Sequence, residues 1–360
     1  MATKLHESFL QLVRLGVGTS RDAIISEDVN WTLLKALADS QGLSAIVLDG
    51  IDKCHSETTD LPVQLKLEWI GEVLQNYEQR YKQYEVAISN LVGWYNKYSF
   101  KMMVLKGYAC AINWPKPEHR PCGDVDIWLF GKQREVDALL AKEKEIKVDT
   151  SHHHHTVFEW QGFTVENHYD FVNIYAHKSS RGLEKVFKEL GQDDSHYVDI
   201  CGEKIYLPSP NLHALFLLRH MMSHFAAAEI TLRQVLDWAF FVKKLTAEID
   251  WEWLTDILEK YHMIDFYNCI NAICVEDLGF EVSLFPSVQF DPSLKDRVLN
   301  DILEPAYTAE EPRGLINKFV YKYRRWQGNA WKQEMCYDES RLSAFWLGVR
   351  TKLFKPFLLW

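Results

Sequence analysis

The spacing of hydrophobic residues divides the chain into helical and strand-forming stretches. Over residues 1–98, apolar positions recur at helical spacing, as in WTLLKALADS, and predict a helical N-terminal region. After Phe100 the pattern changes, because KMMVLKG (101–107) and DVDIWLF (124–130) are short apolar runs typical of strands. The segments HTVFEWQ and FTVENHYDF, rich in β-branched and aromatic residues, predict two more strands. From about Pro208 the apolar stripe of amphipathic helices returns.

This order of elements predicts an α+β protein in three parts. We expect a helical N-terminal region at 1–98, a core with a sheet at 99–207 and a helical C-terminal domain at 208–360. The segments near 208 and at 279–292 carry proline and glycine, which favours boundaries there.

Composition narrows the classes of function that the chain can serve. With 360 residues, 47% of them hydrophobic, it can bury a large core. The formal net charge of −10 argues against broad nucleic-acid binding and favours small or neutral substrates. Seven cysteines without a C-x-x-C pair indicate a reducing, cytoplasmic compartment. We expect neither a signal peptide nor a transmembrane segment, because no apolar run approaches the ~20 residues that a membrane helix requires.

Two aspartates stand at the start of one predicted strand, in the stretch RPCGDVDIWLF. Because side chains alternate between the two faces of a strand, Asp124 and Asp126 should project to the same side. Adjacent carboxylates repel each other unless a cation lies between them, and hard oxygen ligands suit Mg²⁺ or Mn²⁺. The alternative is that Asp124 is a turn residue and Asp126 faces water.

A third carboxylate follows in FTVENHYDF, where Glu166 shares a strand face with His168 and Asp170. If this strand pairs beside the first, Glu166 joins the two aspartates. Three carboxylates on two adjacent strands can hold two metal ions, which stabilise the attacking and leaving oxygens of a displacement at phosphorus. The pattern therefore predicts phosphoryl-transfer chemistry.

The order VLKG, RPCGDVDIWLF, FTVENHYDF resembles the polymerase-beta nucleotidyltransferase superfamily, in which a glycine turn precedes a [GD]-x-D strand and a later strand supplies a third acid. More narrowly, it resembles an uncharacterised bacterial nucleotidyltransferase family with an E-x-H strand and a helical tail. The resemblance runs from about residue 100 to 260. It implies a polymerase-beta-like mixed sheet flanked by N-terminal helices and a C-terminal helical domain, with residues 99–207 as the nucleotidyltransferase catalytic core.

The resemblance also implies roles for individual residues. Asp124 and Asp126 would bind both metal ions, and Glu166 would complete the metal site and help to deprotonate the acceptor hydroxyl. Gly107 would let the backbone approach the triphosphate. His168, from the E-x-H strand, would contact the nucleotide.

The sequence departs from this pattern at two positions. Tyr108 follows the glycine where most superfamily members have Ser or Gly, so Lys106 is the candidate substitute for the missing phosphate clasp, unless it is a solvated lysine at a strand end. Asn167 stands where the family usually has an apolar residue. Arg120 either contacts a phosphate or anchors the loop before the strand.

Histidines gather at two places. In the run SHHHHT (151–156), strand alternation would place His152 and His154 on one face and His153 and His155 on the other, so that at most one pair faces the cleft. This run is either a separate zinc site or a polar strand surface that touches phosphates.

The second place is RHMMSH, where the two histidines are four residues apart on a helix that lacks the glutamate of a zinc protease. By resemblance His224 is a candidate nucleotide contact, and the alternative is an interior histidine. Arg233 and Asp237 are spaced as a helix ion pair or as substrate ligands.

The C-terminal stretches 318–333 and 345–360 interleave basic and aromatic residues. The first could stack on nucleic-acid bases and the second could rest on a membrane surface or a partner. Amphipathic helices whose aromatics pack on the core are the alternative for both.

Together these features favour a metal-dependent nucleotidyltransferase that moves a nucleoside monophosphate from an NTP to a hydroxyl and releases pyrophosphate. The alternative is a catalytically inactive nucleotide-binding or regulatory partner protein of the same fold. A third class, an enzyme that modifies nucleic-acid ends, depends on the basic and aromatic C-terminus. The acceptor, the base preference, the choice between Mg²⁺ and Mn²⁺ and the oligomeric state stay open.

Overall fold

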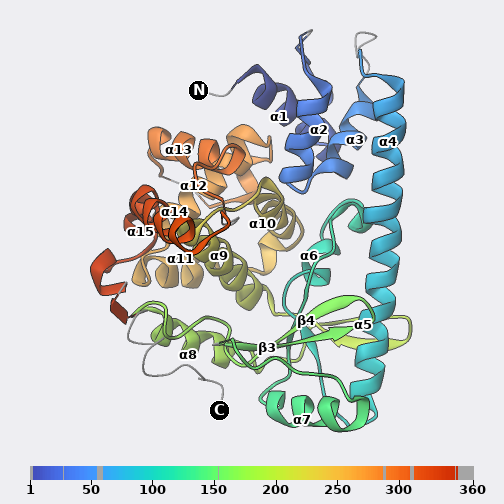
Figure 1. The fold of residues 1–360 in the computed structure, drawn as a ribbon, viewed down its shortest axis with the longest axis vertical. Helices are drawn as coiled ribbons and strands as arrows, with labels where there is room; N and C mark the ends of the chain where they lie inside the picture. The colour runs from blue at the N-terminus through green and yellow to red at the C-terminus, as the bar shows by residue number, and fades with distance from the viewer. Residues whose placement is uncertain are drawn as a thin grey trace.

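A six-stranded mixed sheet lies between helices from both halves of the chain in the computed structural model (Figure 1). The predicted α+β fold, a mixed sheet flanked by N-terminal and C-terminal helices, is confirmed. The structure describes residues 3–26, 28–54, 60–152, 154–286, 289–308, 312–344 and 346–347.

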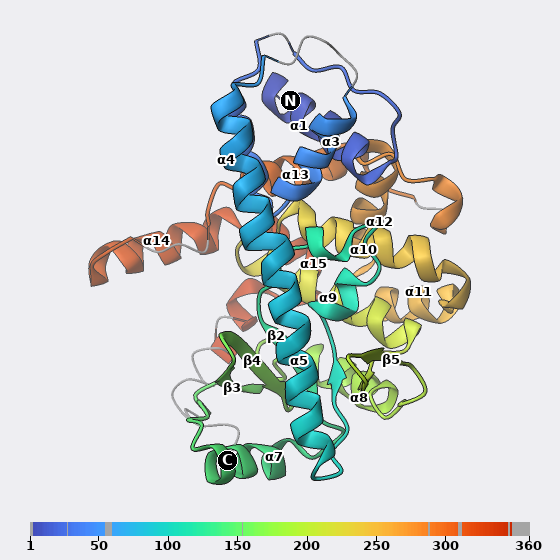
Figure 2. The ribbon, with the colours of Figure 1, turned by 90° about the vertical axis from the view of Figure 1, so that its right-hand side faces the viewer.

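The N-terminal region is helical, as the periodicity predicts. It comprises α1 (Lys4–Val17), α2 (Trp31–Ser40), α3 (Ser44–Lys53), α4 (Val63–Val73) and α5 (Arg80–Asn96). A π-helical segment, Leu74–Gln79, joins α4 and α5, so that the two run as one long helix from the N-terminal helices down past the sheet (Figures 1 and 2).

The sheet has the strand order β3-β4-β2-β1-β6-β5. Its strands are β1 (Met103–Val104), β2 (Val125–Trp128), β3 (His155–Trp160), β4 (Phe163–His168), β5 (Tyr197–Ile200) and β6 (Glu203–Tyr206). Strand β2 runs parallel to β4, and β1 runs parallel to β6, while the other pairs are antiparallel. The β5–β6 hairpin is an addition to the four predicted strands.

The remaining helices lie within the sheet region or follow it in the chain. Within the sheet region lie α6 (Tyr108–Ala111), α7 (Gln133–Lys144) and α8 (Ser180–Leu190). The C-terminal helices are α9 (Pro210–Ala227), α10 (Leu232–Leu245), α11 (Trp251–Lys260), α12 (Ile264–Ala272), α13 (Pro292–Leu303), α14 (Leu315–Gly328) and α15 (Ala330–Cys336).

Strand alternation sends the two faces of the sheet into two hydrophobic cores. Val125 and Ile127 join the side chains of α5 in the smaller core. Trp128, on the opposite face of β2, joins the larger core, which contains residues of α8 and α9 and also unites α1–α4 with α10–α13. Asp126 shares the face of Trp128 and therefore points toward the C-terminal helices. The larger core extends across both predicted boundaries, and the three-part division of the chain stays a prediction.

The basic and aromatic stretch 318–333 forms α14 and α15. Figure 2 shows α14 extending away from the other helices, and Phe319 is 73% exposed. Trp331 of α15, in contrast, packs against the larger core. Most of the second stretch, 345–360, lies outside the described residues. Within the described part of the chain, no helix is both long enough and apolar enough to cross a membrane.

Candidate active site

The three predicted carboxylates line one cavity between the sheet and the C-terminal helices. Asp126 lies opposite Glu166 in the parallel register of β2 and β4, and Asp124 directly precedes β2. All three side chains contribute to the wall of this cavity, whose volume is about 850 Å³. The pairing of β2 beside β4 therefore brings the acids together, as the strand pattern predicts.

Asp126 is the buried member of the set, with 3% of its surface exposed. Lys106 Nζ lies 2.8 Å from Asp126 Oδ1, and His168 Nε2 lies 3.1 Å from the same oxygen. Burial alone would raise the pKa of Asp126, but these two cations outweigh it and hold the pKa well below its usual range. Asp126 is therefore an anion at neutral pH.

His168 links Asp126 to Glu166, because its Nε2 also lies 3.6 Å from Glu166 Oε2. Burial would lower the pKa of His168, but the hydrogen bonds to the two carboxylates raise it to about 9. His168, which the resemblance assigns to the nucleotide, thus contacts both Asp126 and Glu166 and holds the two carboxylates in position.

Asp124 has a different electrostatic environment, since its side chain is exposed to the cavity. Partial burial raises its pKa, and the charges of Glu166 and Asp126 raise it further. Crowded carboxylates of this kind suit a divalent cation, which would relieve their repulsion. Ligand atoms of Asp126, Glu166 and His168 also lie within 4.8 Å of one another. The donor set therefore fits a divalent metal ion.

The turn between β1 and α6 is shaped around Gly107, whose φ of 59° is unfavourable for other residues. A Cβ atom at Gly107 would lie 2.2 Å from Tyr84 Oη. That hydroxyl donates a 2.9 Å hydrogen bond to the carbonyl of Asp124. Gly107 thus makes room for a contact between α5 and the strand that carries the aspartates.

Replacing Gly107 by alanine is expected to lower the free energy of unfolding by more than the roughly 1–3 kcal/mol of backbone strain alone, because Tyr84 must also move. Gly131→Ala is the matched control, since Gly131 also has a positive φ, 89°, but its Cβ would meet nothing within 4 Å. Urea denaturation measures both variants. Equal losses in the two variants would contradict the steric role of Tyr84.

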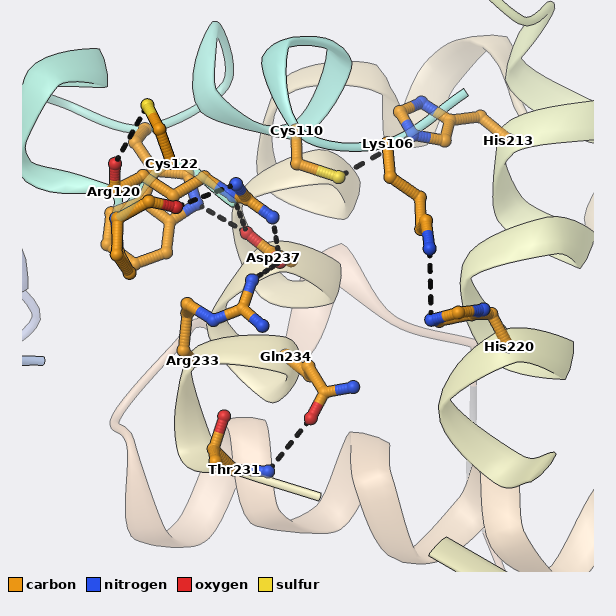
Figure 3. A network of polar contacts seen from close by, with 12 residues as sticks. Lys106, Cys110, Arg120, Cys122, His213, His220, Thr231, Arg233, Gln234 and Asp237 are labelled. Carbon is orange, nitrogen blue, oxygen red and sulfur yellow. Dashed lines mark hydrogen bonds and ion pairs between the residues drawn. The ribbon is translucent and has the colours of Figure 1, made fainter. Parts of the chain in front are cut away.

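Arg120 anchors the loop before β2 rather than extending freely into the cavity. Its Nε and Nη2 donate to the two oxygens of Asp237 at 2.7 and 2.9 Å, and Nη1 donates to the Pro121 carbonyl at 3.2 Å. Arg233 Nη1 and Trp114 Nε1 donate to the same carboxylate, and Figure 3 shows both arginines converging on Asp237. These contacts favour the anchoring interpretation of Arg120.

Two histidines of α9 complete the cavity wall. His220 Nε2 lies 3.3 Å from Lys106 Nζ, a contact visible in Figure 3, and the ring of His224 lies 4.4 Å from that of His220. Burial, followed by the charge of Lys106, lowers the pKa of both histidines. Neutral His224 therefore faces the cavity, as expected of a nucleotide contact, but its role stays a prediction.

The histidine run does not alternate as predicted, because β3 begins only at His155. His154 and His155 both line the cavity, although strand alternation would separate them. His153 lies outside the described residues. Asn167, which stands where the family usually has an apolar residue, lies on the face of β4 opposite to Glu166. It is buried there, and its Nδ2 donates a 2.8 Å hydrogen bond to Asp137 of α7.

Sequence reasoning misses Tyr84 altogether, and for Asp237 and His155 it names the residue but not the partner that gives it a place in the site. Tyr84 supports the backbone at Asp124, Asp237 fixes Arg120, and His155 Nε2 lies 3.8 Å from Glu166 Oε1. The contacts of Tyr84 and Asp237 join positions 40 and 117 residues apart, and no local motif encodes them. For His155, the only signal is its place in the histidine run.

The chain was compared with protein families, curated proteins and solved structures. A family model described as "uncharacterised nucleotidyltransferase" matches residues 27–279. The crystal structure of an antigenic nucleotidyltransferase-like protein from Paracoccidioides brasiliensis matches at 14% identity and a TM-score of 0.34, covering 50% of this chain and 87% of that chain. No curated protein matches significantly. Since the family model covers most of the sequence, the chain belongs to the family of uncharacterised nucleotidyltransferases.

Proposed function

We propose that the protein is a metal-dependent nucleotidyltransferase that moves a nucleoside monophosphate from an NTP to a hydroxyl group of an acceptor. The observation that carries the proposal is the meeting of Asp124, Asp126 and Glu166 on two adjacent strands in one cavity. Family membership supports the reaction class and the use of an NTP.

Asp124, Asp126 and Glu166 would hold one or two Mg²⁺ or Mn²⁺ ions. Such ions neutralise phosphate charge and favour in-line displacement. In the reaction, the acceptor oxygen bonds to the α-phosphorus, and the bond from that phosphorus to the pyrophosphate oxygen breaks. Glu166 accepts the hydroxyl proton. Its side chain is 24% exposed, so it can meet an acceptor within the cavity.

Lys106 is the residue of this chain best placed to meet the triphosphate. It lines the cavity, and its ammonium group is already directed at the carboxylates, 2.8 Å from Asp126. Nucleotide binding would offer this ammonium group phosphate oxygens as additional acceptors. The neutral ring of His220 beside Lys106 adds no competing charge, so a phosphate would share the ammonium group with Asp126 alone among the contacts of the described residues.

One observation favours the second candidate, a nucleotide-binding protein without turnover. Tyr108 is 7% exposed and packs on Tyr81, at a ring distance of 6.2 Å, outside the residues that line the cavity. It therefore supplies no hydroxyl clasp for the phosphates. Such a protein would bind an NTP in the same cavity but would release no pyrophosphate.

The test incubates the full chain with each of the four α-labelled NTPs, with Mg²⁺ or Mn²⁺, and with candidate acceptors that include the protein itself. We expect pyrophosphate release and transfer of label that stop when EDTA removes the metal. Stabilisation against heat by NTP and metal, without pyrophosphate release, would favour the second candidate. The absence of both turnover and stabilisation would overturn both.

A further inference from the structure

A cluster of three imidazole rings lies beside the carboxylates, and two of its members, His154 and His155, have no part in the proposed transfer. One ligand nitrogen each from His154, His155 and His168 lies within 4.8 Å of the others. His155 and His168 face each other in the antiparallel register of β3 and β4, and His154 precedes β3 directly. The ring of His154 lies 4.4 Å from that of His155 and 5.8 Å from that of His168.

Two of these three rings have a buried nitrogen without a hydrogen-bond partner. His155 and His168 are 7% and 3% exposed. Nδ1 of His154 and Nδ1 of His155 are both buried, and neither has a hydrogen-bond partner among the described residues. A buried polar atom without a partner is energetically costly, so two such atoms in adjacent residues indicate a missing ligand.

The third ring, His168, already has a partner at each of its two nitrogens. Its Nε2 lies 3.1 Å from Asp126 Oδ1, and its Nδ1 lies 3.3 Å from the carbonyl oxygen of Asp170. A metal ion bound by His168 must therefore replace one of these contacts, whereas the buried Nδ1 atoms of His154 and His155 have no partner to give up among the described residues. Histidine binds metal ions through an unprotonated ring nitrogen.

We propose that His154, His155 and His168 form a second metal site, selective for a divalent transition ion of the Zn²⁺ class. Imidazole ligands favour such ions, whereas Mg²⁺ prefers the oxygen ligands of the neighbouring carboxylates. Three protein ligands leave one position of a tetrahedral site open. Glu166 Oε1, 3.8 Å from His155 Nε2, is the nearest described carboxylate oxygen to that ring.

The site depends on the histidines and is independent of the proposed transfer reaction. His168 nevertheless belongs to both groups of ligands, since its Nε2 also contacts Asp126 at 3.1 Å. A transition ion on the imidazoles would therefore compete with Asp126 for His168. Zinc binding and the geometry of the carboxylates are thus coupled through one ring.

The test measures Zn²⁺ binding to the full chain, without an affinity tag, by equilibrium dialysis in excess Mg²⁺. We expect the wild type to bind a single Zn²⁺ ion and the His154→Gln/His155→Gln variant to lose affinity at least about tenfold, as changes around metal ligands commonly do. His196→Gln is the matched control, because His196 is a half-exposed histidine outside the cavity. Substituting Co²⁺ should give visible absorption bands that this control variant retains.

A competing set, Asp126, Glu166 and His168, would also bind an ion through His168. Asp126→Asn separates the two. If the histidines are the ligands, this substitution should not weaken Zn²⁺ binding, because it removes the carboxylate that competes for His168. Loss of Zn²⁺ in Asp126→Asn with retention in the double histidine variant would overturn the proposal, as would absence of binding to the wild type. If circular dichroism shows that the double variant is unfolded, single His154→Gln, at the most exposed ligand, must still weaken binding.

Discussion

Replacing Asp126 by asparagine is expected to reduce the rate of nucleotidyl transfer by roughly 10³-fold. The substitution removes a metal-ligand charge, and a loss of about 4 kcal/mol of charge stabilisation in the transition state corresponds to this factor. Asp124→Asn should have an effect of similar size, because the two aspartates line the same cavity. Release of pyrophosphate from the NTP that the wild type uses measures both variants.

The control for this prediction is Asp52→Asn, since Asp52 is a half-exposed carboxylate whose partner is Lys66 and which lies outside the cavity. It should transfer nucleotide at the wild-type rate. Thermal unfolding of each variant checks that lost activity does not reflect lost structure. Transfer within about tenfold of the wild type in both cavity variants would refute the assignment of Asp124 and Asp126.

Replacing Asp237 by asparagine is expected to lower the free energy of unfolding by about 3–5 kcal/mol, the usual cost of removing one partner of a buried ion pair. The side chains of Asp237 and Arg120 are only 7% and 5% exposed. The variant would leave the guanidinium of Arg120 buried without a compensating charge, and that of Arg233 would lose the same partner. Urea denaturation followed by tryptophan fluorescence measures the loss.

Lys132→Ala provides the comparison, because Lys132 and Glu135 form an ion pair whose side chains are 53% and 58% exposed. Exposed pairs of this kind contribute less than about 1 kcal/mol, and the unfolding midpoint should hardly change. If Asp237→Asn is as stable as Lys132→Ala, Arg120 does not depend on this anchor. It would then be available to phosphate, as the resemblance also allows.

The parts of the site that the sequence predicts are those governed by local periodicity. The alternation of Asp124, Val125 and Asp126 reflects a backbone property of strands, and it places both acids toward one cavity. Glu166 is predictable once its strand is assumed to lie beside the first, which the β2–β4 pairing shows. Strand assignment and face assignment together thus account for the carboxylates.

The rest of the site depends on contacts that no local pattern encodes. The position of Asp237 under Arg120 follows from how α10 packs against the loop before β2. His154 and His155 both line the cavity because β3 begins only at His155, so that His154 precedes the strand and does not follow its alternation. A strand end is set by tertiary pairing, so alternation alone cannot locate it.

The ties between the sheet and the C-terminal helices determine how the protein can be dissected. A fragment ending at Tyr206 would keep all three carboxylates but would lose Asp237, the partner of Arg120, and His220, the neighbour of Lys106. Without α9, the sheet face that Asp126 and Trp128 share would also become exposed to solvent. A fragment meant to carry the proposed chemistry must therefore keep α5, the sheet, α9 and α10, although Asp124, Asp126 and Glu166 all lie in the first half of the chain.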